Sequence, residues 1–93
     1  MASGSRQKLG PGYVWVEHQQ GRVLELHGVP LASLQPVSTA WLVTVLITGA
    51  GIEAQRVVVP SLDRGVGWLV TWARHRNLAL ERMVDEILRR PPG

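Results

Sequence analysis

Residues 61–90 read SLDRGVGWLVTWARHRNLALERMVDEILRR, and their apolar side chains return at the spacing of an α-helix. At about 100° per residue, one face of such a helix would carry Leu62, Val66, Leu69, Ala73, Leu80, Met83, Val84 and Ile87. Most of the charged side chains fall on the opposite face. Because so long an apolar face has to lie against other apolar groups, the stretch predicts one long amphipathic helix packed on a sheet.

The chain has 93 residues, of which 45% are hydrophobic and 18% charged, as in a globular domain that buries its own core. We expect residues 1–11 to form a flexible leader, residues 12–90 a single domain and residues 91–93 a C-terminal tail. The absence of cysteine excludes a disulfide framework and thiolate metal sites. The apolar runs are too short to cross a bilayer, so we expect a cytoplasmic protein.

Two segments of alternating polarity, residues 13–17 and 22–27, predict the first hairpin of the sheet. A three-residue loop, with Gly21 in the left-handed conformation, would pair Val14 and Val16 with the two leucines of the second segment. A two-residue loop would instead place a glutamate opposite a valine, so the longer loop is preferred because it gathers one apolar face. The other face then carries Tyr13, Trp15, Glu17, Val23, Glu25 and His27.

The second hairpin follows a connection over residues 28–38, where Pro30 and Pro36 disfavour regular structure. Branched apolar residues then predict strands. We expect a central strand over residues 39–48, a glycine turn over 49–51 and a returning strand over 52–59.

Pro60 would end the last strand, and Ser61 or Asp63 can cap the helix that follows. The predicted fold class is therefore α+β. It consists of a four-stranded antiparallel sheet, made of two hairpins, followed by one long C-terminal amphipathic helix packed on one face.

Patterns with a catalytic meaning are weak in this chain. Residues 49–54 (GAGIEA) match the dinucleotide fingerprint G-x-G-x-x-A, but that motif requires a helix next and a strand pattern follows instead. Glu17, Glu25 and His27 share a predicted strand face, where solvated polar side chains are a simpler interpretation than a metal site. No serine or threonine lies in a recognisable nucleophile setting. We expect no enzyme, no cofactor and no metal.

Four tryptophans stand out in so short a chain. Trp41, Trp68 and Trp72 lie on predicted apolar faces and are expected in the core. Trp15 shares the predicted outer sheet face with Tyr13, and exposed aromatic rings serve protein interfaces or stack on nucleic-acid bases. The predicted partner-binding residues are Tyr13, Trp15, Arg22, Arg56, Arg74 and Arg76.

A protein partner is favoured over nucleic acid by the distribution of charge. The net charge of +3 comes mostly from the chain ends, and six basic residues face seven acidic ones when those ends are set aside. Glu17 and Glu25 on the predicted outer face would also repel phosphate. We therefore expect a small non-enzymatic interaction or adaptor module that binds a macromolecule through its aromatic sheet face or its helix.

The alternative is a single-stranded nucleic-acid-binding domain. The expected order of four strands and one helix resembles the coactivator-type and Whirly-type single-stranded DNA-binding domains, a resemblance of element order without a shared motif. It implies that Tyr13 and Trp15 would stack on bases while the arginines named above contact phosphates.

The length of the predicted helix indicates a homodimer. Residues 61–90 would form a helix about 45 Å long, whereas a compact chain of this size is roughly 32 Å across. A second chain would cover the overhanging end, with an interface formed by Leu78, Leu80, Met83, Val84, Ile87 and Leu88. A helix broken near Arg76 and Asn77, with its second part folded back on the sheet, is the competing interpretation and needs no partner.

Overall fold

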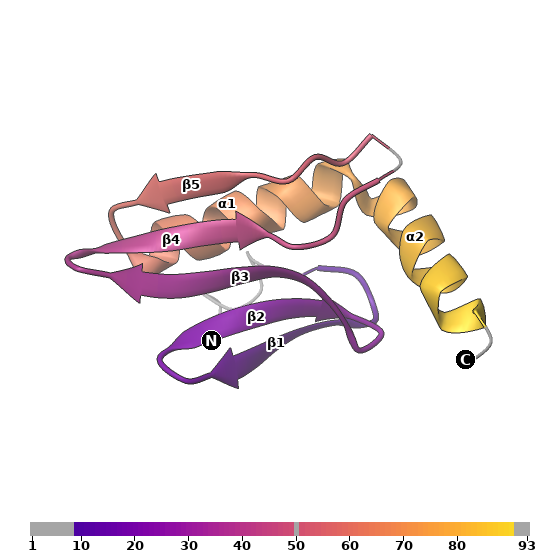
Figure 1. Cartoon of the computed structure of the whole chain (residues 1–93), viewed down its shortest axis with the longest axis horizontal. Coiled ribbons are helices and arrows are strands. Elements are labelled where there is room, and N and C mark those ends of the chain that lie inside the picture. The colour runs from indigo at the N-terminus through magenta and orange to yellow at the C-terminus, as the bar shows by residue number, and fades with distance from the viewer. Residues whose placement is uncertain (1–8, 50, 91–93) are drawn as a thin grey trace.

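The computed structural model describes residues 9–49 and 51–90 and contains a sheet and two helices (Figure 1). In chain order the elements are β1 (Tyr13–His18), β2 (Gly21–Leu26), β3 (Val29–Val37), β4 (Ala40–Val45), β5 (Arg56–Val59), α1 (Leu62–His75) and α2 (Asn77–Arg89). The described residues do not include most of the predicted leader or the predicted tail at residues 91–93.

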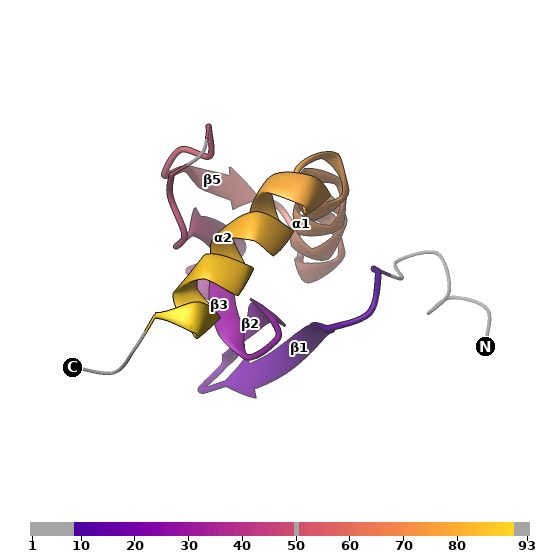
Figure 2. The same cartoon turned by 90° about the vertical axis from the view of Figure 1, so that its right-hand side faces the viewer.

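The five strands form one antiparallel sheet in the order β1-β2-β3-β4-β5, so each strand pairs with its neighbours in the chain. Helix α1 packs against β3, β4 and β5 on one face of the sheet. Helix α2 turns away from α1 and crosses the end of the sheet, as Figure 2 shows. The predicted α+β class with an antiparallel sheet is therefore confirmed, but the sheet has a fifth strand and the helix is divided.

Strand β3 occupies the segment that was expected to be an irregular connection. Its prolines stand where the sheet does not need their missing N–H groups. A two-residue turn joins Val37 to Ala40, so these two residues form a hydrogen-bonded pair. Pairs alternate along the ladder, and the next pair, Pro36 with Trp41, is therefore a non-hydrogen-bonded one. Pro30 lies where the register between β2 and β3 shifts. A proline pattern that usually ends strands is thus accommodated inside a central one.

The register of the first hairpin differs from the predicted one. His18 pairs with Gly21, so the loop has two residues, and Gln19 takes a positive φ of 57°. Trp15 consequently lies opposite Leu24 on the helix-covered side of the sheet, and Val14 is left 53% exposed on the outer side. The prediction of an exposed aromatic face was wrong because a shift of one residue exchanges the two faces of a strand.

Gly21 is needed for space and not for a left-handed turn. It is buried in β2, and a Cβ atom there would collide with the backbone carbonyl oxygen of Leu34 in β3. Any other residue would force β2 and β3 apart at the point where the hairpin enters the sheet. The glycine of this hairpin therefore fixes the spacing of two strands.

The glycines between β4 and β5 form a turn. Gly49 and Ile52 exchange backbone hydrogen bonds of 2.9 and 2.8 Å, and both Gly49 and Gly51 have positive φ values, of 122° and 85°. A strand follows, as predicted, although β5 begins only at Arg56. Residue 50 lies outside the described residues, but the segment after Gly51 lacks the helix that a dinucleotide fingerprint requires.

The long predicted helix is broken at Arg76. Helix α1 begins as expected, with the Oγ atom of Ser61 accepting a hydrogen bond of 3.2 Å from the backbone N–H of Arg64. It ends where Arg76 adopts φ −116° and ψ 19° and donates its N–H to the carbonyl of Ala73. The break lets α2 fold back over the end of the sheet, where a continuous helix would have carried its apolar side chains into water.

The break removes the reason for expecting a dimer. Leu80 and Val84 of the predicted interface are fully buried within the chain itself, and Met83 packs against the same core. The other predicted interface residues are exposed on α2: Leu78 by 79%, Ile87 by 40% and Leu88 by 57%.

We now expect a monomer when light scattering is measured after size exclusion. The mass should be near 10.2 kDa, because each chain covers its own helical stripe. A mass near twice that value would contradict this expectation. Replacement of Leu88 by Glu should then lower the mass if α2 forms the contact.

The packing of α1 on the sheet depends on a close approach at its first turn. Gly65 is buried there, and a Cβ atom would collide with the side chain of Leu34 and lie 3.4 Å from Cγ2 of Val59. Leu34 is itself fully buried, and its strand β3 is paired with β2 on one side and β4 on the other. The helix therefore lies closer to the sheet at this end than any residue larger than glycine at position 65 would permit.

A matched pair of alanine variants tests this approach. Gly65→Ala and Gly67→Ala both improve helix propensity by about 1 kcal/mol, but a Cβ atom at Gly67 has no neighbour within 4 Å. We expect Gly67→Ala to raise the melting temperature and Gly65→Ala to lower it, with roughly 2 kcal/mol between their unfolding free energies. Equal stabilisation by both variants would show that the helix does not depend on contact at Gly65.

Tyr13 ties β1 to the start of α2. Its hydroxyl donates a hydrogen bond of 2.8 Å to Oδ1 of Asn77. Burial of the ring, and secondarily the carboxylate of Glu81, raise the pKa of Tyr13 from 10.0 to about 12. Since the folded pKa is the higher one, the contribution to stability is complete below pH 10 and is lost as the pH rises toward 12.

The pH dependence of unfolding should therefore change in Tyr13→Phe. The wild-type melting temperature is expected to fall between pH 10 and 12, whereas that of Tyr13→Phe should stay nearly level over this range. Asn77→Ala serves as the control, because it removes the acceptor but leaves the ring buried and so should retain most of the slope. A decline in Tyr13→Phe as steep as in the wild type would assign the effect to another group.

Candidate functional site

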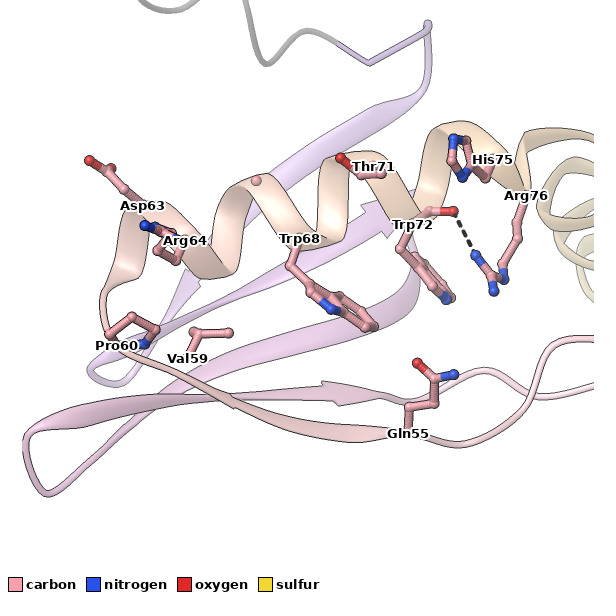
Figure 3. A pocket seen from close by; sticks show the side chains of 11 residues that line it. Gln55, Val59, Pro60, Asp63, Arg64, Trp68, Thr71, Trp72, His75 and Arg76 are labelled. Carbon is pink, nitrogen blue, oxygen red and sulfur yellow. Dashed lines mark hydrogen bonds between the residues drawn. The ribbon is translucent and has the colours of Figure 1, made fainter.

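A groove of about 740 Å³ runs between helix α1 and the edge strand β5 (Figure 3). It is larger than four other surface hollows, which measure about 250 to 400 Å³. Its lining comes from the segment before α1 and from successive turns of that helix: Gln55, Val59, Pro60, Asp63, Arg64, Gly67, Trp68, Thr71, Trp72, His75 and Arg76.

The two tryptophans of α1 define the apolar wall of the groove. Trp68 and Trp72 are four residues apart, so their side chains leave the helix on the same side. Figure 3 shows both rings pointing from α1 toward the segment that contains Gln55 and, in β5, Val59. Trp72 is only 4% exposed, whereas Trp68 is partly buried against the core. The groove thus exposes part of the Trp68 ring, while Trp72 lines it with only a small exposed surface and is held in place by the core.

Gly67 leaves the rim of the groove open. It lies one residue before Trp68 on α1, and a Cβ atom there would meet no atom within 4 Å. Glycine in a helix interior costs about 1 kcal/mol relative to alanine. At this position the absent side chain leaves space beside Trp68 that a larger residue would fill.

Arg76 closes the end of the groove nearest α2. Its guanidinium carbon lies 5.9 Å from the centroid of the Trp72 ring, and Nη1 donates a long hydrogen bond of 3.5 Å to the carbonyl of Trp72. These contacts orient a cation over the aromatic wall. Within residues 9–49 and 51–90 the ion pairs are His27 with Glu81 and Asp85 with Arg89, so Arg76 keeps an unpaired positive charge there.

The opposite end of the groove carries charges of both signs. Asp63 and Arg64 lie in the first turn of α1, and the backbone N–H of Arg64 is already held by the Ser61 cap. Arg64 and Arg76 against Asp63 give the lining a net positive charge. The groove therefore combines an aromatic wall with a weakly basic rim.

The predicted partner-binding residues are not brought together. Tyr13 and Trp15 are both partly buried against the core on the helix-covered face. Arg22 lies opposite Glu17 in the first hairpin, and Arg74 lies beside Tyr13 on the side of α1 away from the groove. Of the six residues, Arg76 lines the groove and Arg56 begins the strand that bounds it.

The predicted core position is confirmed for Trp72, and Trp68 packs partly buried against the same core, but the sequence did not indicate that both also line a groove. Their spacing of four residues was visible in the sequence and puts them on one side of a helix. Whether that side meets a covered strand or the open edge of a sheet depends on strand order, which no local pattern reveals. Gly67 carried a further signal, since glycine is disfavoured inside a helix, but Gly65 carries the same signal and lies on the sheet instead.

Neither a metal site nor a membrane span is found in the part of the chain that the structure describes. Those residues contain no group of three or more His, Cys, Asp or Glu side chains arranged to hold an ion. Of the two helices described there, neither is long and apolar enough to cross a bilayer.

No family model, curated protein or solved structure matches this chain. The groove and the residues that build it are therefore the features of this chain from which a function can be inferred.

Proposed function

We propose that this chain is a non-enzymatic protein-interaction module that binds its partner in the groove between α1 and β5. The observation that carries the proposal is the aromatic wall formed by Trp68 and Trp72 along a groove of about 740 Å³. Tryptophan and arginine are the residues that contribute most to binding energy at protein interfaces, above all where they are held in place before the partner arrives. Arg76, stacked on Trp72, supplies the second of these.

The groove offers little for catalysis. Thr71 and His75 lie one turn apart on α1, but no hydrogen bond joins them among the described residues. The carboxylate that could orient such a pair, Asp63, is two turns away along the helix. A nucleophile needs a base within hydrogen-bonding reach and a third group to orient it. Binding without chemistry is therefore the simpler function for these residues.

The nucleic-acid alternative has lost its main support. It required Tyr13 and Trp15 to stack on bases, but their rings face the core. The fifth strand and the divided helix also depart from the element order on which the resemblance to the single-stranded DNA-binding domains depended. The arginines that would contact phosphates lie on different sides of the molecule.

An affinity capture with matched leucine variants tests the proposal. Gly67→Leu should fill the groove without unfolding the helix, because the position is open and leucine favours helices. Arg74→Leu introduces the same residue on the other side of α1 and serves as the control. We expect proteins that the wild type and Arg74→Leu retain to be lost from Gly67→Leu.

A nuclease-treated sample and a salt series accompany the capture. Retention that persists after nuclease and changes little with salt supports a protein partner. Equal retention by Gly67→Leu, or retention that nuclease abolishes, would contradict the proposed function. Melting temperatures of both variants confirm that the loss of binding is not a loss of fold.

A further inference from the structure

Strand β5 is an edge of the sheet, and its free backbone groups can be assigned from one hydrogen bond. The N–H of Val45 in β4 donates to the carbonyl of Gln55 over 2.9 Å, so this is a hydrogen-bonded pair. Since such pairs alternate along an antiparallel ladder, Val57 and Val59 also direct their backbone groups toward β4. The N–H and C=O groups of Arg56 and Val58 therefore point away from the sheet.

A strand added beside β5 would place alternate side chains in the groove. Directly opposed residues of neighbouring strands share a face, and Val57 and Val59 face α1. Residues of the added strand opposite these two valines would therefore point toward Trp68 and Trp72 (Figure 3). Apolar side chains at every second position fit that wall.

The charge of the groove favours an acidic residue in the same strand. The Arg76 guanidinium is partly buried and stacked on Trp72, and it takes part in neither ion pair of the described residues. A carboxylate arriving at that end would form a charge-assisted hydrogen bond without displacing an existing partner. The side chain of Arg56 lies on the outer face of β5, where it would repel basic residues on the outer face of the added strand.

Among the residues that the structure describes, the other edge of the sheet lacks this combination. Beside β1 the hollow under α1 measures only about 250 Å³ and is lined by Leu9 and Tyr13, which pack against the core. At β5, by contrast, free backbone groups lie directly next to the larger groove. The short length of β5, four residues ending at Pro60, also limits indiscriminate pairing with other strands.

We propose that the ligand is an extended peptide segment of a partner protein that adds to β5 as a sixth strand, inserts alternate apolar side chains against Trp68 and Trp72, and pairs an acidic residue with Arg76. This inference rests on the proposed function and specifies its ligand. Strand addition draws affinity from main-chain hydrogen bonds and specificity from the alternate side chains.

A proline at Val58 separates strand addition from other ways of filling the groove. Val58→Pro removes an outward N–H but no hydrogen bond to β4, because Val58 and Leu42 form a non-hydrogen-bonded pair. The probe is a library of random linear peptides displayed on phage and selected against the wild type. We expect peptides with alternating apolar residues and an Asp or Glu, whose affinity falls about tenfold in Val58→Pro and is unchanged in Arg74→Leu.

A double-mutant cycle tests the acidic contact. Arg76→Gln should weaken the selected peptide several-fold, and the same peptide with its acid changed to the amide should lose little more in that variant. If the losses of affinity from the two changes simply add, without coupling, the acid lies elsewhere and this part of the proposal is overturned.

Amide hydrogen exchange gives a readout that does not depend on a variant. In the wild-type complex the amides of Arg56 and Val58 should become protected, whereas those of Val57 and Val59, already bonded to β4, should change less. This measurement decides the question if Val58→Pro does not fold.

The outcomes distinguish this inference from the proposed function. Undiminished binding by a folded Val58→Pro, with Arg56 and Val58 unprotected, overturns strand addition. The proposed function survives that result if Gly67→Leu still abolishes binding. Strand addition is also overturned if the selection enriches basic or helix-forming peptides, or if it enriches no peptides beyond those selected against Gly67→Leu. Binding that neither Val58→Pro nor Gly67→Leu affects overturns both strand addition and the proposed function.

Discussion

The contact of Gly65 with Leu34 and Val59 is the constraint on which the arrangement of helix and sheet depends. It sets α1 low over the sheet at its first turn, while one and two turns later Trp68 and Trp72 fill the space between helix and strand. Small and large residues on one helix face thus fix its height at one end and leave a groove along the other. The same seating directs α1 along β5, so that the aromatic wall follows a free strand edge.

The sequence was informative where periodicity was strong. The amphipathic stripe, the Ser61 cap, the central strand around Val43 and Val45 and the turn at Gly49 all follow from local patterns, and the structure contains each of them. Local patterns are sufficient there because the physical cause is itself local: the spacing of side chains, a cap within three residues, or a positive φ.

The missed features have causes that lie elsewhere in the chain. Pro36 is acceptable in β3 because strand β2 ends before reaching it, and Gly21 is required by a carbonyl in the neighbouring strand. The inward position of Trp15 follows from a loop one residue shorter than expected. The groove was out of reach for the same reason, since a pair of tryptophans lines an open groove only when the strand opposite them has no further neighbour.

Arg76 is the single residue between the two helices: it ends α1, precedes α2, and also forms the end wall of the groove. The direction in which α2 leaves and the position of the guanidinium over Trp72 are therefore set by one backbone conformation. If the groove binds a partner as proposed, a contact with this side chain would act at the residue that joins the two helices. A side-chain substitution that keeps this backbone conformation would change the groove alone, whereas one that alters it would also change the angle between the helices.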